Sequence, residues 1–315
     1  MSSSARGRSK HAPVQVSEEL FAPVSPGIEL CYQTFGDPAD EPLILVMGLG
    51  GPMTWWDPEF CAELARAGFY VVRFDNRDIG RSSRAQGRVT RATLARAFVG
   101  GRVRAPYTLD DVAADTFGLM DHLGMESAHL VGVSMGGMIV QTMTILQPLR
   151  VRSLTSMMSS TGKRTVGWQS PSLFPTLFSP RNSRDDYVAA SGKVWQLIGS
   201  PEYPVDEEES RKRAAETYDR GVPRSGVLRQ MIAILKQPNR SVRLHSLNGP
   251  TLVVHGLADK MVHVSGGRAT AAAIAGSELL LIDGMGHDLP PALFETFVSA
   301  IRRNADREVS RRSSR

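Results

Sequence analysis

The chain has 315 residues, of which 42% are hydrophobic, so it is long enough to bury a large core within one domain. Its formal net charge is +5, but nine Lys and Arg residues lie in segments 1–11 and 302–315, where only two acidic residues accompany them. No basic patch with interleaved aromatic residues occurs between these ends, which argues against nucleic acid as a partner. Serine-rich basic ends are typical of solvated chain, so we expect disordered tails at 1–13 and 305–315.

Membrane, metal and cofactor signals are absent from the sequence. No segment is apolar over the roughly 20 residues that a membrane-spanning helix needs, and the N-terminus lacks the apolar region of a signal peptide. We therefore expect no stable membrane insertion and a cytoplasmic location. Cys31 and Cys61 fall in strand-like and helix-like segments and are expected to be buried thiols. No Cys/His cluster has zinc-ligand spacing, and the glycine loop 48–51 lacks the Lys of a phosphate-binding loop, so we expect no cofactor.

Short apolar runs alternate with helix-like segments along the chain, which predicts an α/β fold with a doubly wound, mostly parallel sheet. Residues 14–21 are expected to pair with the run 28–34 as an antiparallel hairpin at the sheet edge. The core is predicted to comprise 14–160 and 247–304. The strand-like runs are 28–34, 43–46, 69–74, 128–133, 151–158, 251–255 and 278–282.

The alternation breaks at 161–246, which we interpret as an inserted helical cap over the carboxyl edge of the sheet. Residues 168–182 hold three prolines among apolar side chains and are predicted to form an irregular loop. Helical patterns follow near 184–198, 206–220 and 224–236. A cap of this kind excludes water and contributes substrate contacts. The alternative is a separate helical domain without a catalytic role.

A nucleophile elbow is predicted by the pentapeptide Gly132-Val133-Ser134-Met135-Gly136. In such an elbow a strand ends, the backbone turns sharply, and a serine hydroxyl is exposed where a helix begins. The preceding run 128–131 is apolar, and 137–146 carries apolar residues at helical spacing before Pro148. Glycine on both sides of the serine avoids collisions within the tight turn. Ser134 is therefore the expected nucleophile, the alternative being a plain strand-to-helix turn.

A serine nucleophile needs a base, and His287 is the best candidate among the seven histidines. It lies in a glycine-containing loop after the apolar run 279–282, at the carboxyl end of a predicted strand, where open α/β sheets carry their sites. His255 ends another strand and is expected to pack beneath the loop that follows.

The acid that orients this base is predicted to be Asp259, which follows the strand 251–254. The stretch after the elbow helix, 154–160, contains no carboxylate that would compete. Asp283 and Asp288 lie close to His287 in sequence, but they are expected to cap its loop. The chain order Ser, Asp, His differs from that of the two common serine protease families.

An oxyanion hole completes the predicted site, with backbone N–H groups of Leu49 and Met135 as donors and Gly50 as the second choice for the loop donor. Trp55 or Trp56 is expected to wall the acyl site while the other packs in the core. The segment 75–82 is expected to be a charged turn whose side chains bond to one another and to local backbone; alternatively, Arg77 and Asp78 border the site entrance. The predicted apolar substrate pocket, for which core packing is the alternative role, comprises Met47, Gly50, Trp55, Met157, Met158 and Met285.

Together these features resemble the α/β-hydrolase superfamily over residues 25–305. Met47-Gly48 and the Phe-Asp-Asn-Arg-Asp-x-Gly-x-Ser segment at 74–82 resemble its aclacinomycin methylesterase-like and bacterial lipase/esterase branch. The resemblance implies a serine hydrolase that cleaves a carboxylic ester of an apolar small molecule through an acyl-enzyme, with a methyl ester as one candidate. The alternatives are thioester, lactone or C–C hydrolysis, perhydrolysis, and a non-catalytic ligand-binding role. A serine at position 134 disfavours halide and epoxide hydrolysis, because those relatives use a carboxylate there.

Overall fold

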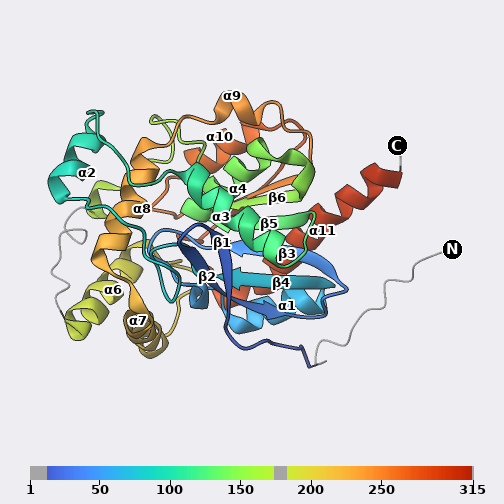
Figure 1. The fold of residues 1–315 in the computed structure, drawn as a ribbon, viewed down its shortest axis with the longest axis horizontal. Coiled ribbons are helices and arrows are strands. Elements are labelled where there is room, and N and C mark those ends of the chain that lie inside the picture. Colours follow the sequence, from blue (N-terminus) through green and yellow to red (C-terminus); the bar gives the residue numbers. More distant parts are fainter. Residues whose placement is uncertain (1–12, 174–182, 314–315) are drawn as a thin grey trace.

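An eight-stranded sheet forms the centre of the computed structural model, which describes residues 13–173 and 183–313 (Figure 1). The strands lie in the order β1-β2-β4-β3-β5-β6-β7-β8. Strands β3 to β8 run parallel to one another, whereas at one edge β2 pairs antiparallel with both β4 and β1. The predicted mostly parallel sheet is confirmed. The strands are β1 (Leu20–Ser25), β2 (Ile28–Phe35), β3 (Glu41–Val46), β4 (Phe69–Phe74), β5 (Ala128–Val133), β6 (Val151–Met157), β7 (Thr251–Gly256) and β8 (Glu278–Ile282).

Alternate residues of the central strands point into two cores, one on each face of the sheet. On β3, Leu43 and Leu45 belong to one apolar cluster, and Ile44 and Val46 belong to the other. Helices α3, α4 and α10 cover the face that contains Ile44, and α1 and α11 cover the opposite face. These helices are α1 (Pro58–Arg66), α3 (Leu109–His122), α4 (Met135–Leu146), α10 (Ser265–Ala273) and α11 (Phe294–Ser313).

Side-chain caps define where several helices begin. Asp57 accepts the Glu59 backbone N–H at the start of α1, and Pro58 occupies the first helical position. Thr108 and Asp111 form a reciprocal capping box at the start of α3. These local bonds satisfy backbone donors that have no partner inside the helix.

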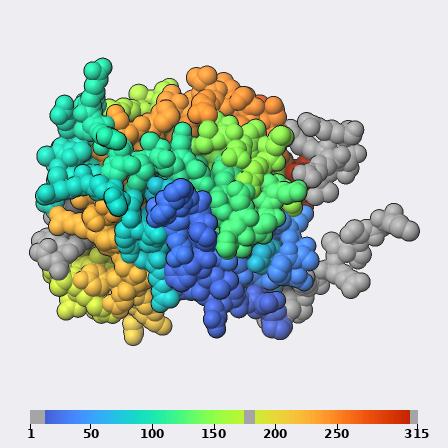
Figure 2. All heavy atoms as spheres, in the orientation of Figure 1, coloured from blue at the N-terminus to red at the C-terminus, as the bar shows by residue number. Residues whose placement is uncertain are grey.

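The chain between β6 and β7 forms helices rather than further strands of the sheet. In Figure 1, α6, α7 and α8 lie together at one end of the molecule, beside α2 (Arg91–Phe98). The space-filling view shows the same end as one continuous surface of teal, orange and yellow atoms (Figure 2). Part of the predicted irregular loop, residues 174–182, lies outside the described residues. The helices are α6 (Arg184–Ile198), α7 (Glu207–Gly221), α8 (Arg224–Lys236) and α9 (Ser241–Leu244).

The C-terminal segment differs from its prediction. The sequence indicated a disordered tail at 305–315, but α11 continues to Ser313. Its apolar stripe includes Phe297, Ile301 and Ala305, all essentially inaccessible to solvent, so burial carries the helix past the predicted boundary. Although α11 has 20 residues, no helix in the described part of the chain is long and apolar enough to cross a membrane. The predicted N-terminal tail lies almost entirely outside the described residues.

The first strand also begins later than predicted. The ladder with β2 starts at Leu20 rather than at residue 14, and Val16 makes only an isolated bridge to Phe35. Ser17 bonds to the backbone of Thr34 through both its N–H and its hydroxyl, so this stretch follows β2 without a regular ladder. Cys31 and Cys61 are both buried free thiols, as expected.

Candidate active site

Ser134 lies at the turn between β5 and α4, in a backbone conformation that is rare for a residue with a side chain. Its φ is 57° and its ψ is −117°, a strained combination that holds the side chain at the turn. A Cβ on Gly132 would lie 2.3 Å from the Gly136 carbonyl oxygen, and one on Gly136 would lie 2.0 Å from the Val46 oxygen. Neither position has room for a side chain, so the glycines are required for the turn to pack against the sheet.

The elbow is tied to the end of β6. The Ser134 backbone N–H donates to the Met157 carbonyl at 2.9 Å, and the Ser159 hydroxyl donates to the Ser134 carbonyl at 2.8 Å. The Met158 N–H in turn donates to the Val254 carbonyl on β7 at 2.8 Å. The carboxyl ends of β5, β6 and β7 therefore form one connected edge of the sheet.

Asp259 and His287 meet at this edge, in a direct hydrogen bond between the loops that follow β7 and β8. His287 Nδ1 lies 2.7 Å from Asp259 Oδ2. The other carboxylate oxygen accepts the backbone N–H groups of Met261 and Val262, each at 2.8 Å. The loop thus holds the carboxylate in one orientation, facing the imidazole. Both side chains are buried. The backbone N–H of His287 donates to the Ile198 carbonyl at the end of α6.

The surroundings of Asp259 favour its ionised form. Burial alone would raise the pKa of this carboxyl group. The charge of His287 and hydrogen bonds from His255 and His287 outweigh burial, so the Asp259 pKa is lowered below its usual range. His255 itself is fully buried, and its Nε2 lies 2.8 Å from the Val262 carbonyl. Its position beneath the Asp259 loop agrees with the expectation from the sequence.

The loop after β3 lies directly against the elbow. A Cβ on Gly48 would be 3.1 Å from the Ser134 Cβ and 3.7 Å from its hydroxyl oxygen. The Gly50 N–H, the second choice as oxyanion donor, is already bonded to the side chain of Gln230 at 2.9 Å. In the described part of the chain, the N–H groups of Leu49 and Met135 donate to no protein acceptor. This difference favours Leu49 over Gly50 as the loop donor.

The residues predicted to line a substrate pocket fall into two groups. Met47, Met157, Met158 and Met285 are buried in the apolar cluster beneath α1 and α11, which is the core-packing alternative. Gly50 and Trp55 instead face α6, α7 and α8, the helices inserted between β6 and β7 (the inserted helices). The Trp55 indole N–H donates to the hydroxyl of Thr217 on α7, and its ring packs edge-on against Trp195 on α6. Trp56 is fully buried.

The charged segment 75–82 is more than the local turn that the sequence predicted. Asp75 does accept the local Arg81 backbone N–H, but it also accepts that of Met53, in the segment after β3, and pairs with Arg220 on α7 at 2.8 Å. Asp78 pairs with Arg229 on α8 at 2.5 Å and accepts the Tyr107 hydroxyl. Both carboxylates are fully buried. The segment therefore anchors two inserted helices to the loop after β4.

Sequence reasoning missed the partners of this segment, Arg229 among them, and also Gln230. A signal was available, because this adjacent polar pair interrupts an otherwise apolar helical run, 227–235. Polar residues at such positions are expected to find buried partners.

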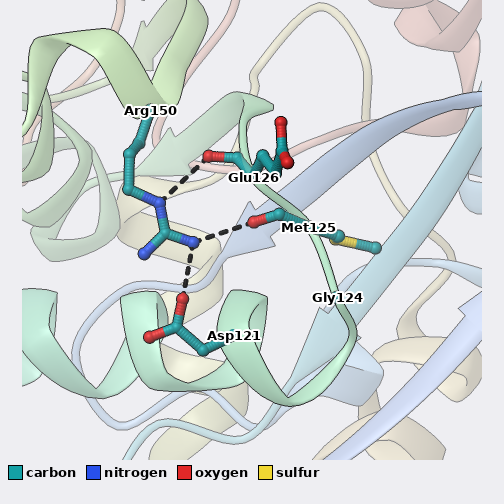
Figure 3. Close-up of a pocket in the computed structure, with 5 residues that line it drawn as sticks. All are labelled: Asp121, Gly124, Met125, Glu126 and Arg150. Carbon is teal, nitrogen blue, oxygen red and sulfur yellow. Dashed lines mark hydrogen bonds and ion pairs between the residues drawn. The ribbon is translucent and has the colours of Figure 1, made fainter.

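A hollow far from the elbow has a structural explanation. Arg150 lines it, and its guanidinium donates to the backbone carbonyls of Glu126 and Met125 and pairs with Asp121 at 2.7 Å (Figure 3). These residues precede or flank the starts of β5 and β6, at the edge of the sheet opposite to Ser134. The hollow is therefore separate from the candidate active site.

Comparison with known proteins places this geometry in a family. The protein family described as "alpha/beta hydrolase fold" matches residues 41–290 of this chain. The rhodomycin D methylesterase DnrP of Streptomyces peucetius is 28% identical over 300 residues, which cover 87% of this chain and 94% of that protein. This relative confirms the methylesterase-like resemblance that the motifs indicated.

Two solved structures share the fold. The enol-lactonase from Burkholderia xenovorans LB400 superposes with a TM-score of 0.71 at 21% identity, covering 90% of this chain and 99% of that one. The esterase RhEst1 from Rhodococcus sp. ECU1013 gives a TM-score of 0.69 at 20% identity, covering 91% and 98%. The family match covers strands β3 to β8 and includes Ser134, Asp259 and His287. The chain therefore belongs to the alpha/beta hydrolase fold family.

Proposed function

We propose that the protein is a serine esterase that hydrolyses a carboxylic ester of an apolar small molecule. The observation that carries the proposal is the 2.7 Å bond between His287 Nδ1 and Asp259, at the same sheet edge as the strained Ser134 elbow. A carboxylate held in this way accepts the Nδ1 proton, which leaves Nε2 of the imidazole free to act as a base. Family membership and the methylesterase relative support the same chemistry.

In the proposed mechanism, Ser134 attacks the ester carbonyl while His287 takes the hydroxyl proton. The Leu49 and Met135 N–H groups stabilise the oxyanion that develops on the carbonyl oxygen. His287 then protonates the leaving alcohol, and the acyl-enzyme forms on Ser134. A water activated by His287 attacks this acyl group, releasing the acid and restoring the serine. Asp259 stabilises the imidazolium that appears in both halves of the reaction.

We further propose that the natural substrate is a methyl ester of a large apolar acid. The support is the name of the relative, a methylesterase, together with the aromatic pair Trp55 and Trp195 where the inserted helices meet the loop after β3. A matched panel of methyl and butyl esters of one polycyclic aromatic acid tests this point, with methanol and butanol quantified. Faster turnover of the butyl ester would contradict the methyl preference without affecting the serine mechanism.

The nucleophile is tested by labelling with a fluorophosphonate probe and by turnover of an activated ester. Ser134→Ala should abolish both while leaving the thermal unfolding temperature close to that of the wild type. Ser153→Ala is the control, because this serine is also buried but lies within β6, bonded to His129. It should retain labelling. Wild-type labelling of the Ser134→Ala variant would refute the proposed function.

A further inference from the structure

Gln230 connects the inserted helices to the loop that carries the proposed oxyanion donor. It lies on α8 and is 1% exposed. Its side-chain oxygen accepts the Gly50 N–H at 2.9 Å, and its nitrogen donates to the Arg77 carbonyl at 3.1 Å. One buried amide therefore bridges the loops after β3 and β4, and it makes one hydrogen bond to each loop.

The far end of this bridge is rigid. The Arg77 guanidinium makes two bonds to the Asp115 carboxylate on α3, at 2.5 and 2.6 Å. The neighbouring Asp78 is bonded to Arg229, the residue that precedes Gln230 on α8. The Gln230 amide is thus held from its own helix and from the loop after β4, so its oxygen can fix the orientation of the Gly50 peptide group.

The near end of the bridge is a segment with little stiffness of its own. Gly48, Gly50 and Gly51 surround Leu49, and Gly50 has a φ of 69°. Among the described residues, a Cβ on Gly50 would come within 4 Å of the Val227 side chain on α8 alone, at 3.5–4.0 Å. The Leu49 side chain packs against the core, but the glycine backbone around it is free to rotate, so hydrogen bonds to the peptide groups contribute to the orientation of this loop.

Those bonds enclose the Leu49 N–H on both sides. Asn76 donates to the Met47 carbonyl at 3.0 Å and so orients the peptide group between Met47 and Gly48. Gln230 orients the peptide group between Leu49 and Gly50. The peptide group between them carries the Leu49 N–H, and its Gly48 oxygen accepts the Gly51 N–H at 3.2 Å. Because N–H and C=O point in opposite directions in a trans peptide, this bond turns the Leu49 N–H out of the loop.

We propose that Gln230 is a positioning residue of the oxyanion hole, which places the Leu49 N–H toward the reacting carbonyl oxygen. The inference rests on the proposed esterase function. The orientation of the proposed oxyanion donors would then depend on Gln230, a residue of the inserted helices that bonds to neither Ser134 nor His287 in the described part of the chain. Substrate binding without the tetrahedral oxyanion does not need this orientation, so Gln230 should affect kcat far more than KM.

Gln230→Met keeps the length of the side chain and removes both hydrogen bonds. Misorienting one donor should lower kcat for an activated ester by roughly 10- to 100-fold. The inhibition constant of a boronic acid, whose adduct with serine is tetrahedral, should rise in parallel, with KM within about threefold of wild type. The control is Arg229→Lys, which weakens the docking of α8 but leaves Gln230 and the charge opposite Asp78 in place. It should keep kcat within about threefold.

Gln230→Glu provides a rescue that a merely structural role would not show. A protonated Glu, like Gln, can accept from Gly50 and donate to Arg77, whereas the ionised form cannot donate. Burial beside a carbonyl oxygen favours the protonated form. The kcat of this variant, divided by the wild-type kcat at the same pH, should therefore rise as the pH falls. The same ratio for Gln230→Met should stay flat.

Amide hydrogen exchange separates the failure of this inference from that of the esterase proposal. Exchange at Gly50 should accelerate at least tenfold in Gln230→Met and remain near wild type in Arg229→Lys, whether or not any ester is hydrolysed. Unchanged exchange, or a kcat loss matched by Arg229→Lys, would overturn the role of Gln230. Loss of the esterase proposal would instead appear as labelling that persists in Ser134→Ala.

Discussion

Replacing Asp259 with Asn tests how the imidazole is oriented. One carboxylate oxygen of Asp259 accepts two backbone N–H groups, at 2.8 Å each, and the other accepts His287 Nδ1 at 2.7 Å. An Asn side chain has one oxygen and one NH₂ group in the same space. The oxygen will face the two backbone donors, since the opposite arrangement would place NH₂ against both of them. The NH₂ group must then face His287.

This orientation reverses the tautomer of His287. Facing an NH₂ donor, Nδ1 has to accept a hydrogen bond, so the ring proton moves to Nε2, the atom that must take the serine proton. The imidazole then cannot act as a base from its ground-state tautomer. The expected loss in kcat is about 10⁴-fold, or roughly 5.5 kcal/mol of transition-state stabilisation. Folding should persist, because the Asn side chain can still bond to the Met261 and Val262 N–H groups and to His287 Nδ1.

The assay is the acylation rate with an activated ester, measured beside thermal unfolding. Asp288→Asn is the matched control, because Asp288 adjoins His287 in sequence but bonds to the backbone and hydroxyl of Ser200. We expect this control to keep kcat within about tenfold. A folded Asp259→Asn protein with more than a tenth of wild-type kcat, or an equal loss in Asp288→Asn, would refute the assignment of the acid.

The remaining predictions concern stability. Gly136→Ala should destabilise by about 3 kcal/mol or more in urea unfolding, because its Cβ would lie 2.0 Å from the oxygen that ends β3; Gly192→Ala in α6 meets nothing within 4 Å and should instead stabilise by about 0.5–1 kcal/mol. Arg229→Met should cost about 3–5 kcal/mol by leaving the buried Asp78 carboxylate without its cation, and adding Asp78→Asn should recover part of this in the same assay. Since the folded-state pKa of Asp259 is lowered, its contribution is present above the unfolded-state pKa near 4 and is lost as the pH falls; acid titration of unfolding free energy should therefore weaken the wild type more than Asp259→Asn.

The catalytic candidates were accessible from the sequence because each one follows a strand with a strong local pattern. Ser134 follows an apolar run that ends in β-branched residues, with glycines at 132 and 136, and Asp259 and His287 follow the last two apolar runs, 251–255 and 278–282. In a parallel sheet the carboxyl ends of neighbouring strands meet at one edge, so local patterns suffice to bring these residues together. The structure places Asp259 and His287 in contact, while their roles in catalysis stay predictions.

The boundaries were harder to predict, because tertiary burial decides them. Residues 305–313 have the composition of a basic tail, but tertiary contacts hold α11 there: Ala305 is buried, and the Arg307 guanidinium donates to the Thr251 and Gly276 carbonyls. The start of β1 likewise depends on its partner strand, since Val14 and Val16 have the alternation of a strand but pair with β2 only at one bridge.

The contacts that join the inserted helices to the active-site loops have no local pattern at all. Gln230 lies 180 positions from Gly50, and Arg229 lies 151 positions from Asp78. Each pair involves a polar residue whose partner is known only once the chain is folded. This separation has a chemical consequence for the proposed mechanism: the ends of β5, β7 and β8 supply the proposed reacting groups, while residues of the insertion hold the loop after β3, which carries the proposed oxyanion donor, and the loop after β4. Variation in the insertion should therefore alter the orientation of the oxyanion loop as well as the substrates that fit beneath the helices.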